Sequence, residues 1–216
     1  MRKLLLPIHF LLIVAVSTPA FALTRFVQDN PFFRRTALSG NVGAGIPVGE
    51  FSSSRPGDGN HDLGAVDWSA DLEHYFGRNI SLGLTVSGST YEDKNGGILD
   101  VDGNLRFGET SISTFGGFLR YVAVNQTPIH PFLRLGVGSV AVQFQDPQER
   151  FRSNRAGTLH AGAGLFAILS DYVALNGQIM YNQGFTENAY IPDNDTRVGF
   201  DIKYWAFTGG VSIFFP

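Results

Sequence analysis

The sequence predicts an all-β protein: a closed, antiparallel, up-and-down transmembrane β-barrel of eight strands. Three observations favour this fold. The last segment of the chain alternates between two kinds of side chain, similar segments recur along the chain, and the connectors between them are short and long in turn. Side chains of a strand point alternately to opposite faces, so one apolar row and one smaller, more polar row fit a wall between lipid and a packed interior.

The last segment, 204–216, shows the alternation most clearly. Its apolar row consists of Trp205, Phe207, Gly209, Val211, Ile213 and Phe215. The interleaved row is Tyr204, Ala206, Thr208, Gly210, Ser212 and Phe214. The apolar row begins with Trp and ends with Phe, as expected of a lipid-facing strand with aromatic girdles at both interfaces.

Seven further segments precede this strand. In chain order, the eight are 36–48, 63–76, 80–91, 110–124, 131–144, 157–169, 172–183 and 198–215. The apolar rows of the first five include Leu38-Val42-Ile46, Val66-Trp68-Leu72, Leu82-Leu84-Val86, Phe115-Leu119-Tyr121 and Leu133-Leu135-Val137. The sixth and seventh segments meet across Ser170-Asp171. Ten strands would require two further segments.

The connectors support an up-and-down arrangement. Those at 77–79, 125–130 and 170–171 are short, whereas 49–61, 92–107, 145–155 and 184–197 are long and polar. The first long connector contains Pro56-Gly57-Asp58-Gly59, which is typical of turns. Every backbone group in lipid must be paired, so the sheet has to close, and single-chain bacterial barrels close with even strand numbers.

The aromatic residues orient the predicted barrel. With the amino end in the periplasm, the second and eighth strands both run inward from the outside. Trp68 and Trp205 then lie at the outer interface, and Phe76 and Phe215 at the inner one. Tyr121 completes this predicted aromatic girdle, the short connectors become periplasmic turns, and the long connectors become extracellular loops.

The amino-terminal residues predict export. Arg2 and Lys3 precede an apolar stretch at 4–16, and Ala20-Phe21-Ala22 fits a cleavage site, so residues 1–22 are expected to be a cleaved secretory signal peptide. An uncleaved membrane anchor is the alternative. We expect 23–35 to be a periplasmic segment and 36–216 the barrel. The chain contains no cysteine, so no disulfide supports the exported fold.

The composition is mildly acidic, with a formal net charge of −3. It offers no basic patch, so no nucleic-acid partner is expected. The predicted location is the cell outer membrane of a Gram-negative-type bacterium, with outer-membrane lipid and lipopolysaccharide as surroundings. We expect a monomer.

The chain resembles the small outer-membrane β-barrels of the opacity, outer-membrane protein A and outer-membrane protein X type. The resemblance rests on the run GAGIPVGEF at 43–51, the run PFLRLGVG at 131–138 and the Phe-ended last strand. It implies that the barrel-assembly machinery reads the carboxy-terminal strand. One departure is that Pro216 follows Phe215, whereas the family usually finishes on the aromatic residue.

Charged residues on the inward rows are the first candidate site. This predicted lumen charge cluster consists of Asp67, Asp71, Glu73, Arg120 and Arg134. Opposite charges facing one another in a narrow lumen should pair, because an unpaired buried charge costs several kcal/mol. The interior of an eight-stranded barrel is just wide enough for side chains to fill, so these pairs are expected to plug it. A narrow path for ions through the same charges is the alternative.

The histidines do not predict an enzyme. His160 should face inward without a second metal ligand, and His74 should lie on the outward row. A lipid-A-modifying enzyme, the distant alternative, would carry His-x-Ser, but Gly162 occupies that place after His160. We therefore expect no catalytic residue, no metal and no cofactor.

The loops are the predicted working surface of a non-enzymatic barrel that mediates surface interaction or envelope integrity; a narrow pore for ions or small solutes is the alternative. Arg150, Arg152 and Arg155 are the candidates for outside contacts, with lipopolysaccharide phosphates as natural partners. An ordinary solvated loop is equally compatible with them.

Asp193-Asn194-Asp195 lacks the further ligands of a calcium loop, so the sequence predicts a turn there.

Overall fold

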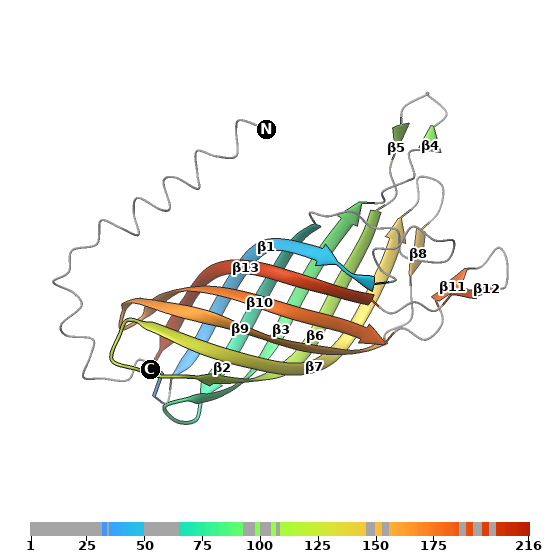
Figure 1. Ribbon diagram of the computed structural model, residues 1–216. Coiled ribbons are helices and arrows are strands. Elements are labelled where there is room, and N and C mark those ends of the chain that lie inside the picture. Colours follow the sequence, from blue (N-terminus) through green and yellow to red (C-terminus); the bar gives the residue numbers. More distant parts are fainter. Residues whose placement is uncertain are drawn as a thin grey trace.

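The protein is a closed eight-stranded antiparallel β-barrel (Figure 1). The computed structural model describes residues 32–33, 35–49, 65–92, 98–99, 105–106, 109–145, 150–152, 156–185, 189–191, 196–198 and 202–216. The barrel strands are β1 (Thr36–Pro47), β2 (Ala65–Tyr75), β3 (Ile80–Glu92), β6 (Glu109–Val122), β7 (Ile129–Gln145), β9 (Ala156–Ser170), β10 (Val173–Phe185) and β13 (Ile202–Phe215). No helix among the described residues is long and apolar enough to cross a membrane.

The strands pair in chain order, and the first pairs with the last. The seam between β1 and β13 is antiparallel from Thr36 opposite Phe215 to Pro47 opposite Tyr204. Since each of the eight strands has a neighbour on both sides, no barrel edge is left open. The predicted fold and strand number are therefore confirmed.

The two ends of the barrel differ. The end that carries the short connectors, the start of β1 and the end of β13 is called the turn end, and the opposite end the loop end. At the turn end, the Asn79 side chain donates to the carbonyl of Val122, and Asn125 Oδ1 accepts from the backbone N–H of Thr127. These local bonds satisfy backbone groups that the strands leave unpaired.

The long connections hold short strands that the sequence patterns do not predict. They are β4 (Ile98–Leu99), β5 (Leu105–Arg106), β8 (Arg150–Arg152), β11 (Ala189–Ile191) and β12 (Thr196–Val198). β8 extends the sheet beside β7, while β4–β5 and β11–β12 form separate hairpins at the loop end (Figure 1). Val198, predicted to open the last barrel strand, instead pairs with Ala189 in the hairpin. Two or three residues are too few to display an alternating pattern.

The outer wall of the barrel is apolar. Its exposed large side chains include Leu38, Val42, Val66, Leu72, Leu82, Leu84, Val86, Phe115, Leu119, Leu133, Leu135, Val137, Leu159, Leu165, Ile179, Phe207, Val211 and Ile213. Water-soluble proteins rarely expose apolar patches of more than a few hundred Å². An apolar belt around all eight strands is the outer surface of a transmembrane barrel, and its alternation with inward polar residues gives the wall its two faces.

Aromatic side chains lie near both ends of this outer wall. Trp68 and Trp205 are exposed close to the loop end, and the Trp205 ring lies 5.1 Å from that of Tyr181. Phe76, Tyr121 and Phe215 are exposed close to the turn end. The residues predicted as an aromatic girdle thus fall into two rows, one at each end.

Candidate functional site: the barrel interior

The interior is filled in layers, with apolar clusters at the two ends and polar residues between them. The turn-end cluster consists of Phe32, Ala37, Tyr75, Val122, Phe132, Phe166, Ile168, Ala174 and Phe214. The loop-end cluster consists of Ala65, Tyr91, Ile112, Val140, Val142, Met180, Ile202, Tyr204 and Ala206. Each cluster draws its residues from strands all around the barrel.

All five residues of the predicted charge cluster point into the lumen. Alternation along β2 sends Asp67, Asp71 and Glu73 inward, and each is at most 4% exposed. Arg120 of β6 and Arg134 of β7 stand opposite one another on neighbouring strands. Two adjacent buried guanidinium groups repel each other, so they require carboxylates close by.

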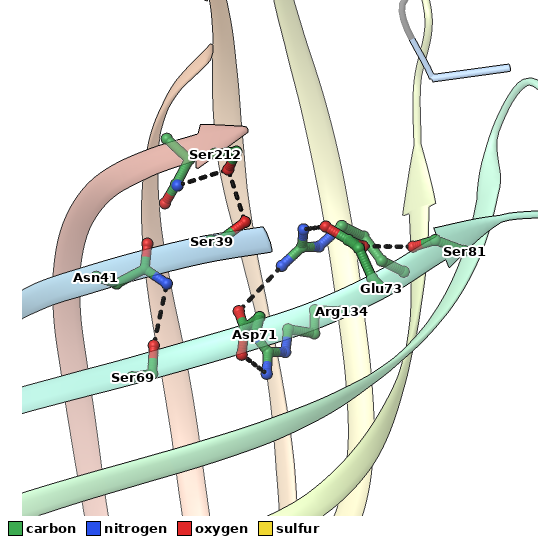
Figure 2. A network of polar contacts seen from close by, with 10 residues as sticks. Ser39, Asn41, Ser69, Asp71, Glu73, Ser81, Arg134 and Ser212 are labelled. Carbon is green, nitrogen blue, oxygen red and sulfur yellow. Dashed lines mark hydrogen bonds and ion pairs between the residues drawn. The ribbon is translucent and has the colours of Figure 1, made fainter. Parts of the chain in front are cut away.

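Two of the three carboxylates meet this need. Arg134 donates two hydrogen bonds to Asp71, from Nη1 to Oδ2 at 2.6 Å and from Nη2 to Oδ1 at 3.0 Å. Arg120 donates to Glu73 Oε1, and its Nη2 lies 3.6 Å from Asp71 Oδ2. Ser81 donates to the other Glu73 oxygen at 2.6 Å. Figure 2 shows this charge network reaching across the interior from β2.

Aromatic rings enclose the two guanidinium groups. The Arg134 Cζ lies 3.9 Å from the centre of the Phe118 ring, and the Arg120 Cζ lies 4.6 Å from that of Phe132. Phe166 also faces Arg120, at 5.1 Å. The negative face of an aromatic ring attracts a cation, and the rings exclude water from the ion pairs. The charges therefore connect β2 to β6 and β7 across the lumen.

Phe32 completes the turn-end cluster, which the sequence reading does not anticipate. The sequence predicts that residues 23–35 are a periplasmic segment, and within this range the Phe32 side chain is fully buried in the mouth of the barrel. Its ring centre lies between 5.1 and 5.5 Å from those of Tyr75, His130, Phe166 and Phe214. The adjacent Arg35 donates to the carbonyl of Asp171 and packs over Tyr172, which fixes this entry of the chain.

Asp67 stands apart from the other charges. Its Oδ2 accepts a hydrogen bond from Ser89 at 2.6 Å, and no ion pair to Asp67 is present in the described part of the chain. The sequence predicts that all the lumen charges pair, and for Asp67 the structure shows a serine instead. The reason is its position nearer the loop end, since both arginines are engaged by Asp71 and Glu73.

The two histidines lie as their parity predicts. His160 is buried in the lumen, and its ring occupies the space above Gly136 that a side chain at that position would fill. His74 is on the outer wall, where its Nδ1 lies 3.0 Å from Thr36 Oγ1 and its ring packs against Phe76. Within the described residues, no group of three His, Cys, Asp or Glu side chains could hold a metal.

The loop candidates are only partly described. Arg150 and Arg152 are the first and last residues of β8, which pairs with the end of β7. Arg155 and Asp193-Asn194-Asp195 lie outside the described residues, as do residues 1–22 with the predicted signal peptide.

Comparison with known proteins identifies the architecture. No family model matches the chain, and no curated protein matches it in sequence. Among solved structures, it is similar to Neisserial surface protein A (NspA), with a TM-score of 0.56, 12% identity, and coverage of 83% of this chain and 97% of that one. It is also similar to Ail, the attachment invasion locus protein of Yersinia pestis, in complex with the heparin analogue sucrose octasulfate. That match has a TM-score of 0.52 and 12% identity, and it covers 85% of this chain and 99% of that one. The chain thus has the fold of the small outer-membrane β-barrels.

Proposed function

We propose that the protein is a non-enzymatic outer-membrane barrel of the Gram-negative cell envelope, whose extracellular loops mediate surface interaction or envelope integrity. One observation carries the proposal: buried apolar clusters lie toward both ends of the lumen, and the paired charges cross it between them. A barrel whose interior does no transport retains its loops as the surface available for partners.

The filled lumen also weighs against the pore. An ion passing through would have to separate Arg134 from Asp71 and then displace the rings around Phe32 and Phe166. Leaving either partner of a buried ion pair uncompensated costs about 3–5 kcal/mol. The interior of an eight-stranded barrel has little spare room in which such a rearrangement could occur.

Single-channel conductance tests this part of the proposal. The mature chain, refolded and inserted into a planar bilayer, should give a silent membrane although a heat-modifiable band on a gel shows that it has folded. Discrete, reproducible openings of the folded protein would contradict the proposal and favour the narrow pore.

The loops offer a chemistry for binding. The predicted contact residues Arg150, Arg152 and Arg155 belong to the chain segment that connects β7 to β9, and Arg150 and Arg152 begin and end β8 within it. Arginine pairs with phosphate and sulfate groups through two parallel hydrogen bonds. The polysulfated sugar in the Ail complex is a ligand of this chemical kind on a barrel of similar fold. We infer that the loop contacts lipopolysaccharide phosphates or other polyanions outside the cell.

A charge-matched pair of variants tests the loop. The double substitution Arg150→Gln and Arg152→Gln should weaken the binding of lipopolysaccharide and sucrose octasulfate to the barrel in nanodiscs, with the loss shrinking as salt is raised. The control, Arg106→Gln with Arg197→Gln, removes the same charge from two other long connections and should bind as the parent does. Equal weakening in both would show only a general electrostatic effect.

Export and assembly complete the proposal. Cleavage after Ala22 would leave a mature chain that starts at Leu23, which amino-terminal sequencing of the purified membrane protein determines directly. The barrel-assembly machinery is the proposed partner of β13, whose outward row ends at Phe215. A variant that lacks Pro216 tests whether the final proline affects the yield of folded barrel.

A further inference from the structure

A small polar chamber lies inside the barrel between the charge network and the loop-end cluster. Its volume is about 30 Å³, enough for one or two water-sized species. The lining residues come from strands all around the barrel and include Asp67, Arg134, His160, Gln178, Tyr204 and Thr208. The chamber thus lies within the ring of strands, with apolar clusters toward both ends of the lumen.

Strand register brings several of the lining residues to the same level. Gly43 of β1 stands between Asp67 of β2 and Thr208 of β13, and Gln178 of β10 follows on the other side of Thr208. These residues form one row across four neighbouring strands. Asp67, Thr208 and Gln178 therefore lie at one level of the barrel, where all three border the chamber.

Several buried polar atoms around the chamber have no protein partner. His160 Nε2, Gln178 Oε1 and Thr208 Oγ1 make no hydrogen bond to the described residues, and each of these side chains belongs to a residue at most 7% exposed. A buried polar group without a partner costs about 1–3 kcal/mol. Two of the three atoms are oxygens, so the chamber presents acceptors for a species that donates hydrogen bonds or carries positive charge.

The charge balance of the lumen points to the same kind of species. Asp71 and Glu73 are matched by Arg134 and Arg120, whereas the Asp67 carboxylate has a serine hydroxyl as its partner. If Asp67 is ionised, it leaves one uncompensated negative charge in a buried site. Burial of an uncompensated charge is strongly unfavourable, so a counter-charge should accompany it.

We propose that the chamber binds one water-sized monovalent cation, which neutralises Asp67. The Asp67 carboxylate supplies the charge, and Gln178 Oε1 and Thr208 Oγ1 supply further oxygen ligands. The positive charge comes either from a sodium ion or from a proton. The proton is carried by a water molecule as hydronium, or it is bound by the Asp67 or His160 side chain. The other charged or titratable groups around the chamber are Arg134, Tyr91 and Tyr204, followed by Arg120, Asp71 and Glu73 in the network.

The test compares unfolding of the refolded mature barrel in detergent micelles under two series of conditions. In the first, sodium chloride replaces choline chloride at constant ionic strength and pH. A site half-filled at about 50 mM sodium should raise the ratio of folded to unfolded protein about tenfold at about 500 mM. In the second, pH falls at constant sodium, and proton uptake should stabilise the folded state progressively because the folded state then binds more protons than the unfolded one.

Three variants assign the effect. Asp67→Asn keeps the shape of the side chain, removes its charge and should lose the parent's response in whichever series shows it. Thr208→Val removes one oxygen ligand, so it should reduce a sodium response severalfold while leaving a proton response in place. Asp171→Asn, at the exposed turn between β9 and β10, is the control and should respond as the parent does.

The outcomes are distinct. A sodium response lost in Asp67→Asn identifies the metal ion, and a pH response lost there identifies the proton. Parent and Asp67→Asn responding alike in both series would overturn the proposal and leave a chamber that holds neutral water only. If Asp67→Asn does not refold, Asp67→Ser takes its place, since parent-like responses to both sodium and pH in that uncharged variant would overturn the proposal equally.

Discussion

Asp71 accepts hydrogen bonds from both terminal nitrogens of Arg134 and also lies near Arg120, so it connects the two arginines of the charge network. Removal of either arginine leaves a buried carboxylate without its ion-pair partner, so that its desolvation is no longer compensated. The energy of such a pair lies less in its formation than in the penalty for breaking it. Single substitutions of the residues in this network are therefore expected to destabilise the barrel.

The first prediction concerns this pair. Arg134→Met should lower the free energy of unfolding by about 3–5 kcal/mol, because Asp71 is left buried without its main partner. Adding Asp71→Asn should restore much of the loss. Urea unfolding of the refolded barrel measures both, with Gln126→Met in the exposed turn after β6 as a control that changes stability by no more than about 0.5 kcal/mol. Equal destabilisation in the single and double variants would contradict the ion-pair interpretation.

At the scale of the elements, the segment before β1 takes part in the barrel. Phe32 packs in the turn-end mouth, while its neighbour Phe33 is half exposed. The second prediction is that Phe32→Ala lowers the free energy of unfolding by about 3–5 kcal/mol, as for a buried aromatic side chain replaced by a cavity. Phe33→Ala should cost much less. A comparable effect of the two substitutions on the unfolding midpoint would argue against the burial of Phe32.

The third prediction concerns the two faces of the strands. Cysteines at Leu82 of β3 and Val211 of β13 should react with lipid-phase probes, because both positions lie on the exposed apolar wall. A cysteine at Ser81, which is buried and bonded to Glu73, should react with neither lipid-phase nor water-phase probes in the folded barrel. Labelling of the first two by water-phase reagents would overturn the assignment of faces.

Most of the elements could be predicted because the information lies within single strands. Alternation along β2 is enough to send Asp71 inward and Leu72 outward, and it needs no knowledge of any other strand. Which arginine meets Asp71 depends on how the strands are staggered around the barrel, and that stagger is set by all eight strands together. Phe32 could not be placed, since it precedes the first alternating segment and is positioned by contacts to four distant strands.

For the whole molecule, closure of the sheet is the decisive property, because it leaves no unpaired strand edge in lipid. The fourth prediction tests it at the seam. Leu38 and Ile213 stand opposite one another on the first and last strands. Opposed residues on antiparallel strands have Cα atoms about 4.5–5.5 Å apart, which suits a disulfide. Cysteines at both positions should form an intramolecular disulfide on oxidation, seen as altered mobility on a denaturing gel.

A matched pair controls the seam experiment. Cysteines at Leu38 and Leu135 lie on strands that do not pair, β1 and β7, so oxidation should not link them within one molecule. If Leu38 and Ile213 fail to crosslink although the barrel has folded, the first and last strands do not meet and the sheet is open.

The burial of Phe32 has a consequence for the timing of assembly. The rings around it belong to β2, to the start of β7, to β9 and to the end of β13, so its binding place exists only after the last strand has joined the sheet. Burial of the Phe32 side chain therefore indicates that the barrel is complete, whereas pairing of individual strands indicates only that assembly is under way. The fluorescence of an aromatic residue at this position would show when the final step of membrane insertion takes place.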